Sequence, residues 1–471
     1  MFRSILLILS GNLSNAVIMM VRNLLVARLI TVEEYGISST FVLAMAIVDM
    51  MSALGLQQQM VQAKNGNDPY LQSALQGFQA LRGVINGAIL FLLAGPLARF
   101  FEMPEVTWAY QTIALVPMLQ GFVHFDIHRM NRQMNYLPGV MTGILPPLVS
   151  LLLIWPLYKL FGDFRIMLFA LLVQSSTLVL VSHLVAKRPY RLVLDRAIMG
   201  SSLRFGWPLL VNGALMFAVF NGERMIIGRE LGMAALGLFS LGFSLALSPT
   251  LVMAKSGTSF FLPQLSAARG DAPAFRNVAM ATFQAHLMMG NILVISLALL
   301  GGPFIHFILG AKYAAAVGLS TWLGILQGIR VAKGGSSTVA LSQAHTGNAM
   351  IANIVRVMLL PIAWYIAVTG GDLVMVVWIG IVGEFVGFVL ALGLALGRQK
   401  LPLRPLLAPL AISGLLFALA AVHAQAQHGA ADWVPGLWTS LGLLALFGVA
   451  LLTMTDLRSY ISRRTLVKHD E

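Results

Sequence analysis

The sequence predicts an all-α membrane protein of about fourteen transmembrane helices. Only 10% of its 471 residues are charged and 58% are hydrophobic, whereas a soluble protein carries about a quarter charged residues. The mean hydropathy is +0.82. Apolar runs long enough to cross about 30 Å of hydrocarbon as helix recur from Ile5 to Met454. These runs are continuous, whereas membrane strands alternate apolar and polar residues, so we expect helices rather than a barrel.

The fourteen spans follow the apolar runs in chain order. Their expected ranges are 5–30, 36–56, 77–98, 107–125, 139–158, 165–186, 203–222, 233–253, 280–309, 314–332, 347–368, 373–396, 405–423 and 434–454. The first run follows Arg3, as a signal peptide would, but it carries Arg22 and shows no small-residue cleavage site. We therefore expect this first span to be retained.

A duplication organises these spans. Arg28 lies eight residues before Gly36, and Arg229 lies eight residues before Gly237, within similar segments. The motifs that recur further along are Pro96, Phe100 and Leu119-Gln120-Gly121, found again as Pro303, Phe307 and Leu326-Gln327-Gly328. Six spans per copy would give both copies the same orientation, with an axis along the membrane normal.

The longest charged connection, from Lys187 to Arg204, separates the two copies. We therefore predict two six-helix lobes in parallel repeat, at residues 1–195 and 196–398. Two further spans and a cytoplasmic tail would occupy residues 399–471. Paired bundles of this kind around a central cavity are typical of secondary transporters that work by alternating access.

The distribution of basic residues predicts the orientation. Most of the 31 Lys and Arg residues fall on the side of the N-terminus, so we expect both termini to be cytoplasmic. Those expected on the other side are Arg28, Arg99, Lys159, Arg165, Arg224, Arg229 and Lys312. The net charge of +13 then reflects topology and attraction to lipid headgroups, and we expect no nucleic-acid partner.

Ionisable residues inside spans are costly and are therefore functional candidates. Arg22 is deep enough in the first span to require water or an anion, whereas Arg28 either lines a cavity or extends to the outer surface. Glu223 and Arg224 occupy the position of Arg22 and Asn23 in the second copy. Either the two lobes form an asymmetric anion-binding cavity, or Glu223 and Arg224 pair with their neighbours.

The remaining deep charges are Asp49, Arg356 and Glu384. Asp49 is either protonated within the membrane or paired with Arg22. Arg356 and Glu384 lie on adjacent spans and are expected to form a salt bridge. The three carboxylates Asp49, Glu223 and Glu384 are also candidates for binding a coupling ion.

Several kinds of chemistry are not expected. The outer loops are short and present no large array of carboxylates or histidines, and no phosphate-binding loop, dinucleotide fingerprint or serine-nucleophile elbow stands in a suitable context. His124 and His128 are spaced i, i+4, but Arg129 and Arg132 beside them would repel a cation. With no cysteine in the chain, thiol catalysis is excluded, and we expect no catalytic residues, metal site or cofactor.

Several motifs resemble a known family. The segment from Arg28 to Gly36 is similar to the "aRlL.peeyG" signature that follows the first span of polysaccharide transporters. These are the oligosaccharide-lipid or O-antigen-type flippases of the multidrug/oligosaccharidyl-lipid/polysaccharide exporter superfamily. The other matching segments are Phe205–Leu210, Ile226–Arg229, Leu236–Phe239 and Phe261–Ser266. Glu230 departs from the family pattern by adding a charge beside Arg229.

The resemblance implies a V-shaped pair of six-helix lobes in the bacterial inner membrane. It implies that the chain moves undecaprenyl-diphosphate-linked oligosaccharide units outward for exopolysaccharide or O-antigen export. Membrane lipids, a polysaccharide polymerase and a co-polymerase would be its partners. A diphosphate crossing hydrocarbon needs fixed cations. Arg22 is the leading contact, and the further candidates are Arg28, Arg82, Arg224, Arg229 and Arg356.

Three alternatives remain open at this point. A lipid II flippase would also show arginines in its cavity and fourteen spans. A drug or cation antiporter of the same superfamily would need carboxylates in the cavity, for which Asp49 and Glu384 are available. A membrane-embedded glycan polymerase or acyltransferase would need catalytic groups outside the membrane, and the short outer loops argue against it.

Overall fold

The computed structural model describes residues 2–51, 54–345, 347–427 and 433–467, and every regular element within these ranges is a helix. The chain forms two compact units. The first consists of Met1–Asn221 and Gly232–Gly237, and the second of Gly222–Leu231 and Leu238–Glu471. The repeat boundaries at residues 195 and 398 stay predictions, because compactness does not test a duplication.

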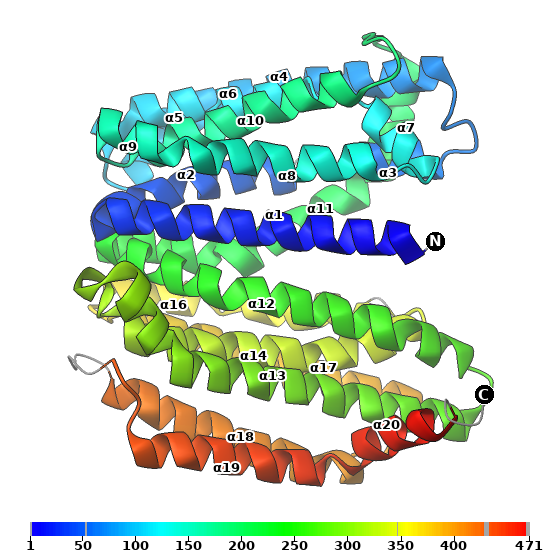
Figure 1. Cartoon of the computed structure of the whole chain (residues 1–471), viewed down its shortest axis with the longest axis vertical. Coiled ribbons are helices and arrows are strands. Elements are labelled where there is room, and N and C mark those ends of the chain that lie inside the picture. The colour runs from blue at the N-terminus through cyan, green and yellow to red at the C-terminus, as the bar shows by residue number, and fades with distance from the viewer. Residues whose placement is uncertain (1, 52–53, 346, 428–432, 468–471) are drawn as a thin grey trace. The chain divides into compact units, whose positions relative to one another are not determined.

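In the first unit, long helices lie side by side (Figure 1). Its elements are α1 (Phe2–Leu29), α2 (Val32–Met51), α3 (Leu56–Gln62), α4 (Pro69–Phe100), a 3-10 turn (Pro104–Val106), α5 (Thr107–Ile113), α6 (Leu115–Gly121), α7 (Asp126–Arg132), α8 (Leu137–Leu152), α9 (Ile154–Phe161), α10 (Arg165–Val185) and most of α11 (Arg196–Ile226). Helix α4 packs against α5 and α6, and α8 packs against α1 and α10.

The second unit begins with the end of α11 and a π-helical turn at Ile227–Leu231. Its further elements are α12 (Gly232–Ala267), α13 (Ala272–Leu309), a 3-10 turn (Ala311–Tyr313), α14 (Ala316–Ser342), α15 (Gly347–Met358), α16 (Leu360–Val368), α17 (Leu373–Gln399), α18 (Arg404–Ala426), α19 (Leu437–Thr453) and α20 (Thr455–Val467). Helix α14 is central, because it packs against α13, α17 and α18.

The all-helical membrane fold is confirmed. Each of the fourteen predicted ranges overlaps one helix or two consecutive helices. By length and composition, eight helices of the described chain could cross a membrane, and the bent pair of α19 and the start of α20 would be a ninth. One of the eight, Leu209–Ala267, overlaps two of the predicted spans, 203–222 and 233–253. The exact number of fourteen spans stays a prediction.

The recurring Leu-Gln-Gly triplet has the same structural basis in both units. In the first, a Cβ added to Gly83 of α4 would lie 2.5 Å from the Cα of Gly121 on α6. In the second, a Cβ added to Gly290 of α13 would lie 2.6 Å from the carbonyl oxygen of Gly328 on α14. In each unit, therefore, a glycine on a long helix meets the glycine of the triplet, and two backbones approach closely.

A second close approach joins the two copies of the arginine and glycine motif, within the first unit. A Cβ on Gly36 would lie 1.8 Å from the carbonyl oxygen of Met233. A Cβ on Gly237 would lie 2.2 Å from the carbonyl oxygen of Val32. Neither position can accept a side chain unless the backbone opposite moves. A single contact between helices therefore requires glycine at both Gly36 and Gly237.

The close contact at Gly36 predicts that a single added methyl group lowers the stability of the protein. Gly36→Ala should lower stability by about 1–3 kcal/mol, because the new Cβ overlaps a backbone oxygen that cannot rotate away. Gly143→Ala in α8 is the matched control, since nothing lies within 4 Å of a Cβ at that position. Thermal unfolding of the purified protein in detergent would measure both variants. Equal melting temperatures would contradict the close packing of Gly36.

The connection between α10 and α11 is packed onto the first unit. The Asp126 carboxylate accepts the backbone N–H groups of Lys187, at 2.8 Å, and Arg188, at 3.3 Å. The Arg188 side chain donates to Gln72 on α4 at 3.0 Å. Further along, the backbone N–H of Val193 donates to the carbonyl oxygen of Ser73 at 3.1 Å. The segment predicted as an inter-lobe linker is therefore held in place along much of its length.

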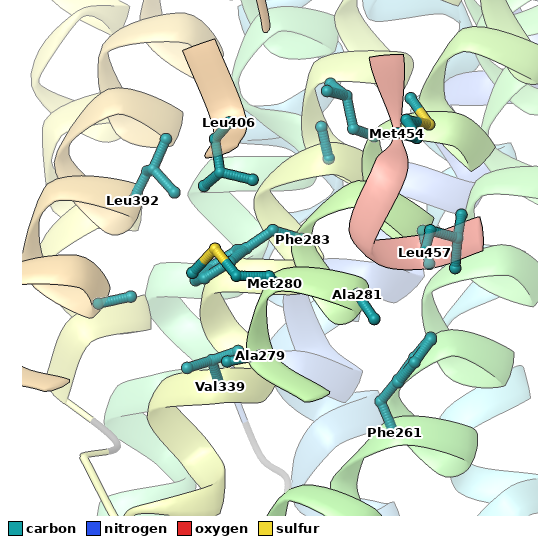
Figure 2. Packing of buried hydrophobic residues seen from close by; sticks show 14 of the residues in the cluster. Phe261, Ala279, Met280, Ala281, Phe283, Val339, Leu392, Leu406, Met454 and Leu457 are labelled. Carbon is teal, nitrogen blue, oxygen red and sulfur yellow. The ribbon is translucent and has the colours of Figure 1, made fainter. Parts of the chain in front are cut away.

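Apolar packing closes the end of the second unit. Figure 2 shows Phe261 of α12, Met280 and Phe283 of α13, Leu392 of α17 and Leu457 of α20 in one buried cluster. The chain bends by 64° between α19 and α20. The buried Gln284 side chain holds this bend, because it donates to the Asp456 carboxylate at 2.8 Å and accepts the Leu457 N–H at 2.9 Å.

Candidate functional site

A cavity of about 680 Å³ lies within the first unit. Its lining comes from α2, α3, α4, α6, α7, α8, α10 and α11. The residues are Asp49, Met50, Gly55, Leu56, Gln57, Gln58, Gln79, Arg82, Gly83, Asn86, Pro117, Gln120, Gly121, Val123, Ile127, His128, Thr142, Leu178, Leu209, Asn212, Gly213 and Met216. A volume of this size is typical of small-molecule sites.

Helix spacing and glycine contacts place the polar side chains at the wall. Gln79, Arg82 and Asn86 are spaced i, i+3 and i+7 on α4, so they share one face. On α11, a Cβ at Gly213 would lie 1.8 Å from the carbonyl oxygen of Met50. This close approach between α11 and α2 brings the neighbouring Asn212 to the cavity.

The charges of the cavity compensate each other. Among the described lining residues, Arg82 is the only permanent cation and Asp49 the only carboxylate. These two side chains interact electrostatically, and the Arg82 Nη2 also donates to Gln79 Oε1 at 3.5 Å. Burial lowers the pKa of His128 to about 4, so this side chain is neutral at physiological pH. The lining therefore carries no net charge.

Six amide side chains dominate the polar part of the lining: Gln57, Gln58, Gln79, Asn86, Gln120 and Asn212. Gln79 donates to the backbone carbonyl of Gln120 at 3.3 Å. Within the described chain, the side-chain amides of Gln57, Gln58, Gln120 and Asn212 form no hydrogen bond with the protein. Each amide can donate two hydrogen bonds and accept at least one, so the wall offers hydrogen bonds without charge.

Arg22 lies elsewhere in the first unit and is 2% exposed. Its Nη1 donates to Gln174 of α10 and, at 3.4 Å, to the hydroxyl of Ser150 on α8. Its Nη2 donates to Asn23 at 3.4 Å, and its buried Nε has no hydrogen-bond partner among the residues that the structure describes. The described residues place no carboxylate within 4.0 Å of this guanidinium. The expected pairing of Asp49 with Arg22 is therefore wrong, because Asp49 faces the cavity and interacts with Arg82.

The other predicted arginines have different surroundings. Arg28 is exposed in the last turn of α1. Arg224 lies over the ring of Phe243, with its Cζ 4.6 Å from the centroid. Arg229 lies in the π-helical turn, 3.8 Å from the carboxylate of Glu230. The added charge at Glu230 thus has a local partner. Of the six predicted arginines, Arg82 alone appears in the described lining of the cavity.

In the second unit, the predicted salt bridge between Arg356 and Glu384 is present. It belongs to a larger cluster, because the fully buried Glu384 also accepts hydrogen bonds from Arg330 Nε and Lys333 Nζ, each at 2.7 Å. Arg356 extends its second nitrogen to Glu223 at 3.3 Å. Glu223 therefore pairs across the unit rather than with a neighbour on its own helix. Three cations share two carboxylates in the interior.

Sequence reasoning missed Arg330 and Lys333. Arg330 lies at the end of the predicted span 314–332 and Lys333 directly follows it, so the sequence predicts both as charges of the cytoplasmic side. Helix α14 continues to Ser342, so both side chains lie inside the bundle. Their i, i+3 spacing places them on one face of α14 and would have indicated a shared partner.

His124, which lies just before α7, is arranged for protein contacts. His124 Nδ1 accepts the Asp126 N–H at 3.1 Å, so Nε2 carries the proton and donates to the carbonyl oxygen of Arg188 at 3.0 Å. Both ring nitrogens of His124 are therefore engaged by the backbone. In the described residues, no group of three or more His, Cys, Asp and Glu side chains could hold a metal ion.

Comparison with known families identifies the family to which the chain belongs. A family model described as polysaccharide biosynthesis protein matches residues 25–318. The chain belongs to this family. The resemblance expected from the motifs is thereby confirmed, and with it a membrane protein of polysaccharide biosynthesis.

Relatives and solved structures agree with this assignment. The chain is 20% identical to the teichuronic acid biosynthesis protein TuaB of Bacillus subtilis over 351 residues, covering 74% of this chain and 72% of TuaB. It is 21% identical to the succinoglycan biosynthesis transport protein ExoT of Rhizobium meliloti, covering 65% of this chain and 62% of ExoT. Its fold is similar to that of the lipid II flippase MurJ in an inward closed conformation. The TM-score is 0.72 at 12% identity, over 98% of this chain and 100% of MurJ.

The charge cluster of the second unit predicts a large loss of stability for Glu384→Gln. Removal of this carboxylate would leave three buried cations with Glu223 alone, at a cost of about 3–5 kcal/mol. Glu230→Gln is the control, because its ion pair is partly exposed and should contribute less than about 1 kcal/mol. Thermal unfolding in detergent would compare the two variants.

A double variant, Glu384→Gln with Lys333→Met, should recover part of the lost stability, because it removes one uncompensated cation. If Glu384→Gln instead unfolded like the unchanged protein and lost only transport, Glu384 would bind a coupling ion and the structural role would be rejected.

Proposed function

We propose that this chain is a flippase of the bacterial inner membrane. It moves undecaprenyl-diphosphate-linked oligosaccharide repeat units from the inner to the outer leaflet, for exopolysaccharide or O-antigen export. The observation that carries this proposal is the hydrogen-bonding cavity inside a largely apolar membrane bundle. Membership of a polysaccharide biosynthesis family supports a saccharide as the cargo of this cavity.

The fold suits the physical requirements of such transport. A saccharide headgroup cannot cross hydrocarbon without losing its hydrogen bonds to water, at a cost of several kcal/mol for each group. A polar cavity replaces those hydrogen bonds, whereas the polyprenyl chain stays in lipid throughout. The chain acts as a transporter in this scheme, and no bond of the substrate is broken.

The position of the cavity along the helices supports uptake from the inner leaflet. With the N-terminus in the cytoplasm, α1 runs outward and α2 returns, so the end of α2 and all of α3 lie on the cytoplasmic side. Asp49, Gln57 and Gln58 belong to these segments and line the cavity. The substrate would therefore enter where its sugars are assembled, and alternating access would release it outside.

The diphosphate needs a cation, and Arg22 fits this role best among the predicted arginines. Its guanidinium is buried among neutral partners, so an arriving phosphate would supply the missing negative charge. Arg356, by contrast, already pairs with two carboxylates. A buried uncompensated arginine is costly to the fold, and a transient anionic partner explains why the chain keeps one.

Arg22→Gln tests this role. Transport should fall about ten- to a hundredfold, because hydrogen bonds to a charged partner contribute about 1.5–3 kcal/mol. Stability should stay equal or rise, because the change removes a desolvated charge and keeps an amide. The measurement is the amount of lipid-linked saccharide on the inner leaflet of cells that carry each variant, together with the melting temperature of each purified protein.

Arg276→Gln is the matched control, because Arg276 is exposed at the start of α13. It should leave both quantities unchanged. Normal export by a stable Arg22→Gln variant would reject the role of Arg22. Cells that lack the protein and accumulate no lipid-linked saccharide on the inner leaflet would reject the flippase itself.

A further inference from the structure

The cavity of the first unit indicates which saccharides it accepts, given the proposed flippase function. We propose that it recognises electroneutral, hydroxyl-rich sugars and discriminates against sugars that carry a carboxylate. The amide groups would bind the sugars, and the anionic diphosphate would be held apart from them. This inference follows from the lining residues and their partners.

The amide groups of the cavity wall that have no hydrogen-bond partner in the described protein are all neutral. Gln57, Gln58, Gln120 and Asn212 have side-chain amides without protein partners in the described chain. A sugar hydroxyl both donates and accepts a hydrogen bond, and an amide presents both kinds of group side by side. Gln57, Gln58 and Asn212 are exposed and Gln120 is half-buried, so their amides are accessible to an occupant of the cavity. A hydroxyl-rich occupant could form hydrogen bonds with them in place of its hydrogen bonds to water.

An acidic sugar would find no such match. A uronate carboxylate needs a cation to replace its hydration, and the described lining offers only Arg82, which interacts with Asp49. Asp49 itself is exposed to the cavity and would repel a second carboxylate. Adding one negative charge to a lining of zero net charge is therefore unfavourable, whereas a neutral sugar is unaffected.

The kind of binding also fits a transported cargo. No Phe, Tyr or Trp stands among the described lining residues, so sugars would be held by hydrogen bonds rather than by stacking on rings. A transporter has to bind its cargo well enough to admit it and weakly enough to release it. Individual neutral hydrogen bonds contribute modestly, which suits this requirement.

The test uses the full-length protein in phospholipid vesicles and two fluorescent probes. Both are polyprenyl diphosphates that carry the same trisaccharide, one with neutral hexoses only and one with a single glucuronic acid. The neutral probe should be flipped at least about tenfold faster, which corresponds to about one unfavourable charge contact. Because the measurement is a ratio of rates, it does not depend on how well each protein sample is incorporated.

Single variants measure separately what the charge and the hydrogen bonds of the cavity contribute to the flipping rates. Asp49→Asn gives the lining a net charge of +1 and should reduce the preference for the neutral probe about tenfold. Gln120→Leu and, independently, Asn212→Leu should slow the neutral probe about three- to tenfold by removing a hydrogen bond. Gln425→Leu is the control, because Gln425 is exposed on α18 of the second unit, and it should change neither rate.

The outcomes separate the inference from the function on which it rests. If the unchanged protein flips both probes equally, or the acidic probe faster, the inference is rejected and the flippase function stands. An unaltered preference in folded Asp49→Asn protein would also reject it. If neither probe is flipped, the proposed function fails, and the inference fails with it.

Discussion

Charge compensation in a medium of low polarity is the constraint on which this structure depends. An ion taken out of water costs several kcal/mol unless partners replace its hydration. The second unit meets this requirement with carboxylates, because Glu384 and Glu223 together hold Arg330, Lys333 and Arg356. The first unit meets it differently, since Arg22 is surrounded by the neutral groups of Ser150, Gln174 and Asn23.

This contrast assigns different tasks to the buried charges. A cation that is hydrogen-bonded to a buried carboxylate, as Arg330 and Lys333 are at 2.7 Å, is held in place. We expect its removal to disturb the packing between α14 and α17. A cation that has only dipoles around it gains more when an anion arrives. The number of carboxylates near a buried arginine is therefore a better indicator of ligand binding than its depth, and this indicator favours Arg22 over Arg356.

The sequence was sufficient for the family, the helical membrane fold and the Arg356–Glu384 pair, because motifs and long apolar runs are local signals. The sequence was insufficient for Arg330 and Lys333. The end of a predicted span is uncertain by a few residues, and this difference decides whether a charge near that end is buried. The sequence also missed the amide wall. The sequence around Gln57, Gln58 and Gln120 carries no motif, and only the packing of α3 and α6 with the other lining helices brings these glutamines to one cavity.

The repeated glycines and the neutral cavity together suggest how specificity and transport are separated. Gly83 and Gly290 make the same close helix contact in the two units, so packing constrains the scaffold of each unit at this point. The residue beside the triplet glycine is a glutamine in both units, but Gln120 faces the cavity whereas Gln327 is buried. A diphosphate common to all such substrates needs a cation, whereas the sugars that vary need hydrogen-bonding groups. In the proposed flippase these tasks would fall to Arg22 and to the amides, so the saccharide specificity could change without altering the bundle.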